Sequence, residues 1–462
     1  MTFSSFCLPK AIAFQLRRYM NAAGLSRISV LAMLGLLLSQ SAQALPTFAR
    51  QTGQSCVACH AGGQYPELTP YGRLFKLTGY TMGEQGNPLS AMLVATNTTT
   101  QMPAADANGN GASSRDGQTI LESASVFLAG KVSDNIGGFA QYTQTFADGG
   151  SFGADNFDLR YADRRIDPSR DLIWGVTLNN NPTVQDVWNS APAWSAPYMS
   201  TTQGAFGGLP YSTLLEGGLA QKVAGVGAYA YLNQSFYAEL TSYQAAKGAL
   251  AFMSYPTQSG DANHAFGGTY LDGNNLYWRL AYTKEWDAHN IMVGAFGFDA
   301  KTLGDNAYAI PDASLGNVHY RDAGLDAQYQ YLLAPHTFTA QIRAIQENID
   351  DNQVTPTYGG AATLNTLFAK ASYVYQQTYG ASLAYRSVTG SSDAAAYTYN
   401  ASSVPDSEVW TPEFFYLVNQ NVRVGLQFNL FAKYLGAVSN YDGAGRNASD
   451  NNTAYVYLWA AF

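Results

Sequence analysis

The sequence predicts an all-β protein: a membrane-spanning barrel of about sixteen antiparallel strands that follows a short N-terminal plug segment. Between residues 90 and 462 the polarity alternates over segments of about ten residues, as in strands with one face toward lipid. Tight connections between these segments alternate with long ones. Of the 462 residues, 47% are hydrophobic and 13% charged, with a mean hydropathy of −0.14. This composition excludes a polytopic helical membrane protein and is unlike that of a cytosolic enzyme.

The first 44 residues have the layout of a secretory signal peptide. Four basic residues precede the apolar run 28–38, and Ala42-Gln43-Ala44 supplies the small residues of a cleavage site. The run is too short to span a bilayer, which needs about 20 apolar residues. We therefore expect export, with cleavage after Ala44; a retained helical anchor is the alternative. The formal net charge of −8 argues against a nucleic-acid partner.

The exported chain keeps two cysteines, both in the motif Cys56-Val57-Ala58-Cys59-His60. C-x-x-C-H is the attachment pattern of c-type haem. The two thiols would form thioethers to the haem vinyl groups, and the adjacent imidazole would be the proximal ligand of the iron. The sequence thus predicts one covalently bound haem c on Cys56 and Cys59, with His60 as the axial ligand. A disulfide, a redox-active pair and half of a zinc site are the alternatives, but zinc needs four ligands and no βαβ pattern surrounds the motif.

The segment 45–89 that carries this motif is too short to form a free-standing haem domain. We therefore expect the walls of the barrel, residues 90–462, to cover the porphyrin inside the lumen. Met82 is the candidate for the second axial ligand, because thioether sulfur is a known haem ligand. The alternatives are a packing methionine, with the sixth position held by a distant histidine or by water.

Three cations flank the motif. Arg50, Arg73 and Lys76 are expected to contact the haem propionates. The alternatives are ordinary surface charge and pairing with barrel carboxylates such as Asp158 and Asp326.

The barrel prediction is specific strand by strand. Leu276, Trp278 and Leu280 alternate with Tyr277 and Arg279, which places the apolar side chains on one face and the others on the opposite face. A soluble β-sandwich would alternate too, but its connections would not be short on one side and long on the other. The predicted strands cover residues 90–101, 118–131, 136–147, 155–164, 170–179, 219–232, 235–243, 274–285, 290–299, 317–332, 336–347, 363–376, 379–388, 408–418, 421–433 and 453–462.

The connection 179–211 is long and rich in aromatic residues, including Trp188 and Trp194. Water would be a poor environment for such a loop. We expect it to fold inward as a constriction of the lumen that contacts the plug; a lid over the extracellular mouth is the alternative.

Several stretches together resemble the fused outer-membrane monohaem cytochrome c-porins of iron-oxidising bacteria. They are the haem motif and residues 46–53 (PTFARQTG), 66–80 (PELTPYGRLFKLTGY), 139–142 (FAQY), 158–162 (DLRYA) and 179–189 (NNNPTVQDVWN). The resemblance implies an outer-membrane oxidoreductase that takes electrons from Fe(II), or another extracellular donor, and passes them through its haem to a periplasmic cytochrome or copper protein. Independently of the resemblance, an even number of strands predicts that both termini are periplasmic. A passive porin with a haem-bearing structural or sensor plug, and outward electron transfer to an external acceptor, are the alternative functions.

Overall fold

The computed structural model describes residues 46–63, 66–102, 116–146, 151–190, 209–254, 270–304, 311–397 and 401–462. The predicted signal peptide and the part of the predicted constriction loop that holds Trp194 lie outside these residues.

The predicted fold class is confirmed: sixteen strands form one closed barrel in which every neighbouring pair is antiparallel. The barrel closes where β1 pairs with β16, from Met92 opposite Ala461 to Thr100 opposite Thr453. The strands are β1 (Leu89–Thr100), β2 (Thr119–Lys131), β3 (Ile136–Thr145), β4 (Ser151–Asp167), β5 (Arg170–Asn179), β6 (Val223–Leu232), β7 (Phe236–Ala245), β8 (Asn275–Trp286), β9 (His289–Leu303), β10 (Asn317–Leu333), β11 (His336–Asp351), β12 (Ala361–Tyr375), β13 (Tyr379–Gly390), β14 (Ser407–Asn419), β15 (Val422–Lys433) and β16 (Thr453–Ala461).

The two faces of the wall differ as the alternation predicts. On β8, Trp278 and Leu280 point outward with 37% and 55% of their surface exposed, whereas Tyr277 and Arg279 point into the lumen and are 2% and 0% exposed. A closed barrel with an apolar outer face can bury that face in lipid while all its backbone groups pair between strands. The wall therefore has the architecture of a transmembrane barrel.

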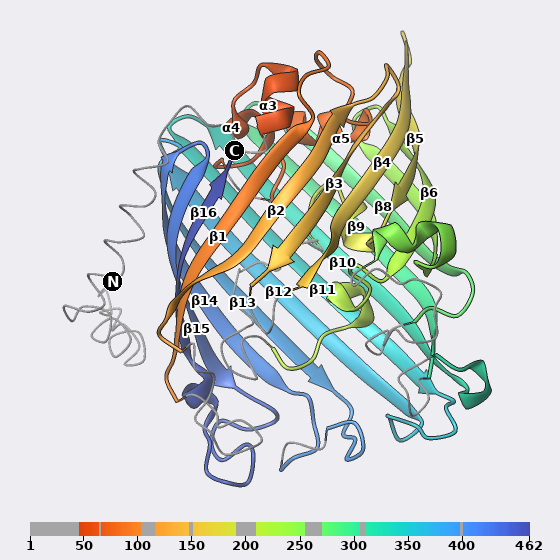
Figure 1. Ribbon diagram of the computed structural model, residues 1–462, viewed down its shortest axis with the longest axis vertical. Coiled ribbons are helices and arrows are strands. Elements are labelled where there is room, and N and C mark those ends of the chain that lie inside the picture. Colours follow the sequence, from red (N-terminus) through yellow and green to blue (C-terminus); the bar gives the residue numbers. More distant parts are fainter. Residues whose placement is uncertain are drawn as a thin grey trace, which may run out of the picture.

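The two ends of the barrel differ as well (Figure 1). Seven connections of two to four residues join β2 to β3, β4 to β5 and so on to β14 and β15, all at one end. Residues such as Asn233, Asp287 and Gln377 adopt positive φ in these turns, which suits tight hairpins. The longer connections leave the strands at the opposite end. β1 begins and β16 ends at the short-turn end, where the C terminus lies.

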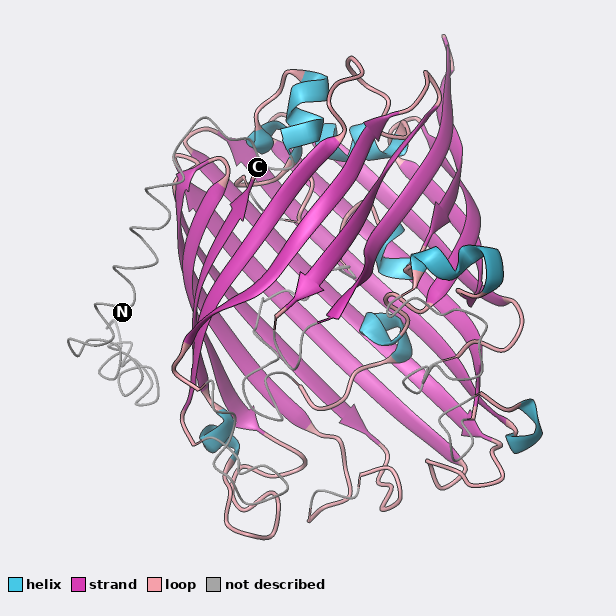
Figure 2. Ribbon diagram, in the orientation of Figure 1, coloured by secondary structure: helices cyan, strands magenta, loops and turns pink. Residues whose placement is uncertain are grey.

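Within residues 46–88, as far as they are described, three helices precede β1: α3 (Pro46–Thr52), α4 (Cys56–Cys59) and α5 (Pro70–Leu77). Figure 2 shows them gathered at the short-turn end. A further helix, α6 (Pro182–Gln185), and helical turns at Leu214–Gly218, Gly248–Met253, Ala313–Leu315 and Ala448–Asn451 lie in the connections between strands. Among the helices of the described part of the chain, none is long and apolar enough to cross a membrane.

Candidate haem site at the mouth of the barrel

Helix α5 is the anchor of the plug, and its limits are encoded locally. Thr69 caps its N terminus by accepting a hydrogen bond from Gly72 N (3.1 Å), and Pro70 occupies the first turn, where no backbone donor is lost. It ends where Gly79 and Tyr80 adopt positive φ and Tyr80 N bonds back to Phe75 O (2.9 Å). This turn points the Tyr80 ring into the lumen.

The C-x-x-C-H motif packs directly on α5. Cys56–Cys59 form the single turn of α4, and Thr69 N donates to Cys59 O (2.9 Å) while Thr69 Oγ1 donates to Ala58 O. Gly72 is required for this approach, because a Cβ at that position would lie 2.1 Å from Cys59 O. The two cysteines and His60 are therefore held as one unit with the anchored helix.

The motif lies beside the short turns of the barrel. Gly62 packs on Val374 of β12, and Gly63 packs on Leu417 of β14. Cys56 Sγ is 3.9 Å from Oε1 of Gln420, in the turn between β14 and β15. The motif thus sits at the mouth rather than deep in the lumen.

A cavity of about 940 Å³, counting the part open to solvent, extends from the motif toward the lumen. Its walls are mainly apolar, with residues from the plug, from β3 and from the connection after β5. The described residues that line it are Phe48, Ala49, Thr52, Gln54, Ser55, Cys56, Cys59, His60, Pro66, Leu68, Gly72, Phe75, Lys76, Tyr80, Phe139, Val184 and Asn189.

The residues around this cavity fit a c-type haem. Cys56 and Cys59 are both thiols, and both line the cavity together with His60. Burial, with a smaller contribution from Cys56, raises the pKa of the Cys59 thiol from 9.0 to about 11. Reactive cysteines have lowered pKa values, so this one does not suit a thiol–disulfide catalyst. No group of three or more His, Cys, Asp or Glu side chains that could hold a metal ion occurs in the described residues.

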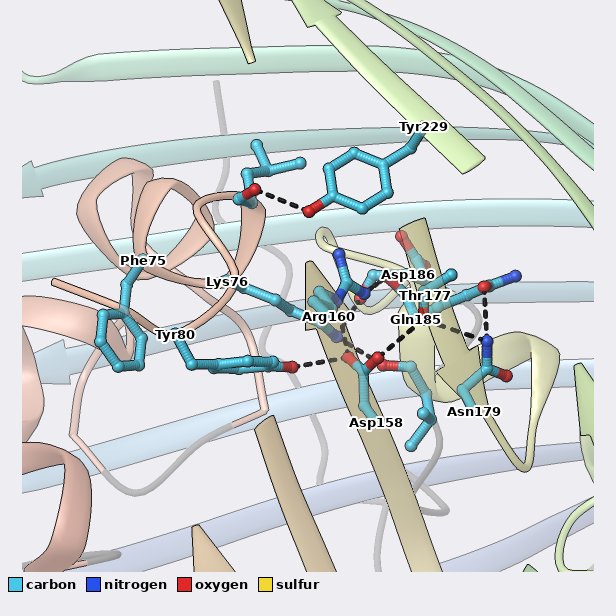
Figure 3. A network of polar contacts seen from close by, with 12 residues as sticks. Phe75, Lys76, Tyr80, Asp158, Arg160, Thr177, Asn179, Gln185, Asp186 and Tyr229 are labelled. Atoms are coloured by element: carbon cyan, nitrogen blue, oxygen red, sulfur yellow. Dashed lines mark hydrogen bonds and ion pairs between the residues drawn. The ribbon is translucent and has the colours of Figure 1, made fainter. Parts of the chain in front are cut away.

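A buried polar network joins the cavity wall to the barrel (Figure 3). Tyr80 donates from its hydroxyl to Asp158 Oδ2 (2.6 Å), and Thr177 donates to Asp158 Oδ1 (2.9 Å). The guanidinium of Arg160 lies 2.9 Å from the same carboxylate and donates to Gln185 O (2.9 Å). Since Asp158 and Arg160 are 0% and 1% exposed, these interactions are shielded from water. The network fastens the plug, β4, β5 and α6 to one another.

The cations that were predicted to contact the haem propionates lie in different places. Lys76 lines the cavity, but its ammonium donates to the carbonyls of Val184 and Asp186. Arg73 lies on another side of α5, where it donates to Asn290 Oδ1 (2.7 Å) and to Gln330 Oε1 (3.1 Å).

Arg50 and Met82 are not among the described residues that line the cavity. Arg50 donates to the carbonyl of Leu89 (2.6 Å), at the start of β1. The carbonyl of Met82 accepts a hydrogen bond from Gln51 Nε2 (2.9 Å). The distal ligation by Met82 stays a prediction. Asp158 and Asp326, the carboxylates considered as partners of the plug cations, pair instead with Arg160 and Arg279 of the barrel.

The prediction of an inward constriction is confirmed for residues 180–190. Trp188 is fully buried and packs with Leu77 of α5. Its carbonyl accepts hydrogen bonds from Gln328 of β10 (3.1 Å) and Gln341 of β11 (3.3 Å). Because the connection leaves from β5, these bonds carry it across the lumen and against the plug.

Sequence reasoning missed Arg160 and Asn189 as residues of the site, and it considered Asp158 only as a partner of the plug cations. A signal existed for Asp158 and Arg160, since residues i and i+2 of a strand share a face and an Asp-x-Arg pair on the lumen face can form an ion pair. No local pattern marks Asn189.

No protein-family model and no curated protein matches this sequence. Among solved structures, the chain is similar to an anion-selective porin from Comamonas acidovorans, with 10% identity, a TM-score of 0.44, and coverage of 81% of this chain and 98% of the porin. A loop-deletion mutant of the Vibrio cholerae outer membrane protein OmpT gives the same four values. The outer membrane channel DcaP of Acinetobacter baumannii has 11% identity and a TM-score of 0.44, with 81% and 96% coverage.

Proposed function

We propose that this protein is an outer-membrane electron-transfer protein that carries one haem c at the mouth of its barrel. The observation that supports the proposal best is the joint placement of Cys56, Cys59 and His60 on the lining of one mainly apolar cavity.

The chain's own residues have separate tasks in this proposal. Cys56 and Cys59 would hold the haem covalently, and His60 would ligate its iron. Phe48, Phe75 and Phe139 line the cavity and exclude water from it. When bound, haem supplies one-electron exchange at its iron.

The short-turn end is the periplasmic end of bacterial outer-membrane barrels. A haem at this mouth would be close to a soluble periplasmic carrier such as a cytochrome or copper protein. In line with the family resemblance, we infer that electrons flow inward, from Fe(II) or another external donor to this carrier. Outward flow to an external acceptor would be the reverse of the same exchange.

The test uses the protein purified in detergent. We expect a c-type pyridine haemochrome spectrum, and reduction of the oxidised haem on anaerobic addition of Fe(II). The double substitution Cys56→Ala/Cys59→Ala should remove the covalent haem, whereas Gln420→Ala, in contact with Cys56, should retain it. A colourless wild-type protein would refute the proposal.

A second candidate function, passage of small hydrophilic solutes, has one observation in its favour. A hollow of about 690 Å³, counting the part open to solvent, lies against β1 to β4 and β16. Its lining includes the polar side chains of Ser123, Gln141 and Asp155. Measurable ion conductance of the protein in planar bilayers would support this function. An absence of conductance would show that the lumen is blocked and would refute it.

A further inference from the structure

Asn189 is a residue of the candidate haem cavity whose buried amide has no partner within the described part of the chain. It lies in the connection after β5, lines the cavity, and has its Nδ2 atom buried with no hydrogen-bond partner among the described residues. Burying an amide donor without a partner is unfavourable, so such groups usually point to a bound ligand or to water.

The position of Asn189 is fixed by its neighbours. The carboxylate of Asp186 accepts hydrogen bonds from the backbone N–H groups of Trp188 (3.0 Å) and Ser190 (2.9 Å). The Trp188 carbonyl is bonded to Gln328 and the Ser190 carbonyl to Arg343. Asn189 itself has a φ of 53°, a left-handed conformation that asparagine tolerates better than most residues. The backbone therefore holds its carboxamide against the cavity wall.

The cavity near Asn189 also favours an anion. Lys76 lines the same cavity, and its ammonium donates to two main-chain carbonyls of the Asn189 connection, those of Val184 and Asp186. A donor N–H and a buried cation together are the groups that recognise a carboxylate.

We propose that Asn189 donates a hydrogen bond to a propionate carboxylate of the haem, so that the barrel's inward connection forms the second half of the haem site. This inference rests on the proposed function. It makes Asn189 a binding residue for the cofactor, contributed by the barrel and not by the plug.

The test is the pH dependence of the haem midpoint potential in the purified holoprotein. Asn189→Asp replaces the donor by an anion of the same shape, so a nearby propionate would hold its proton more tightly. We expect the pH-dependent step of the potential to move upward by about one pH unit. Asn189→Gly keeps the left-handed backbone and removes only the donor, and should move the step in the same direction by less.

Gln377→Glu is the matched control, because it makes the same change of charge at an exposed turn of the same end. The pH dependence of its haem midpoint potential should match that of the wild type. If both Asn189 variants carry haem and show the same pH dependence as the wild type, the Asn189 amide binds water and not a propionate, and the inference is wrong. If neither the wild type nor any variant carries haem, the proposed function is wrong instead.

Discussion

The two sides of the lumen are built differently. On the side of β4 to β11, fully buried ion pairs such as Arg279 with Asp326 (2.6 Å) lie on the wall, and the plug and the connection 180–190 pack against them. On the side of β1 to β4 and β16, hydroxyls, an amide and aromatic rings line the hollow together with the carboxylates of Glu122 and Asp155. Both sides belong to one closed sheet.

This difference shows how one barrel can combine a fixed plug segment with open space. Buried ion pairs that also bond to an inserted segment, as Arg160 does to the Gln185 carbonyl, hold that segment in one geometry. Short neutral side chains such as Ser123 and Ser125 do not fix an inserted segment in this way, and they leave the hollow unfilled. Solute passage would then use the hollow beside β1 to β4 and β16, whereas the candidate haem cavity lies between the plug, β3 and the connection after β5.

The largest expected effect comes from breaking the packed side. Arg160→Met leaves the Asp158 carboxylate buried without its cation, and removing one partner of a buried pair costs about 3–5 kcal/mol. We expect the free energy of unfolding, measured by urea titration in detergent micelles, to fall by this amount. Arg170→Met removes the exposed ion pair with Asp167 and should change the free energy of unfolding by less than about 1 kcal/mol. Equal effects of the two substitutions would contradict the comparison.

A smaller effect should appear as a pH dependence at Lys76. Burial, with a contribution from Arg160, lowers the pKa of Lys76 from 10.5 to about 8. Between these values the unfolded chain binds a proton that the folded chain has lost, so stability rises with pH. The gain should reach about 3 kcal/mol near pH 10.5 in the haem-free Cys56→Ala/Cys59→Ala chain.

The measurement is the difference in unfolding free energy between that chain and its Lys76→Met derivative, followed from pH 7 to 10.5. The difference removes the contribution of other groups that titrate in this range. A flat difference would show that Lys76 is not buried as a cation. In the haem-loaded protein, a propionate near Lys76 would hold its pKa higher and delay the rise.

Much of the wall could be predicted from the sequence, because strand periodicity and turn chemistry are local. The strand predicted at 170–179 has those limits in the structure, and the tight turn at Asn233–Ser235 connects β6 and β7 as expected. The lumen could be predicted only in part. The inward course of 180–190 followed from its aromatic content, but its partners on β10 and β11 depend on contacts about 140 residues apart in the chain.

The glycine content shows the same limit. Gly225 and Gly425 lie under the rings of Tyr243 and Tyr457 on the neighbouring strands, where any Cβ would approach a ring carbon to about 2.3 Å. Such pairs depend on the register between strands, which alternation alone does not give. For the same reason the sequence identified the haem motif but not Asn189, which reaches the cavity only because the barrel closes.

The smallest effect should come from adding volume on the hollow side. Ser123→Phe places a ring in the hollow, so it should change the unfolding free energy by less than about 0.5 kcal/mol while lowering ion conductance in planar bilayers. Gly225→Ala is the control on the packed side, where even one methyl group meets Tyr243 and overpacking costs about 1–3 kcal/mol. If Ser123→Phe destabilised the barrel as much as Gly225→Ala, both sides of the lumen would be packed alike, and the distinction between a packed side and an open side would be wrong.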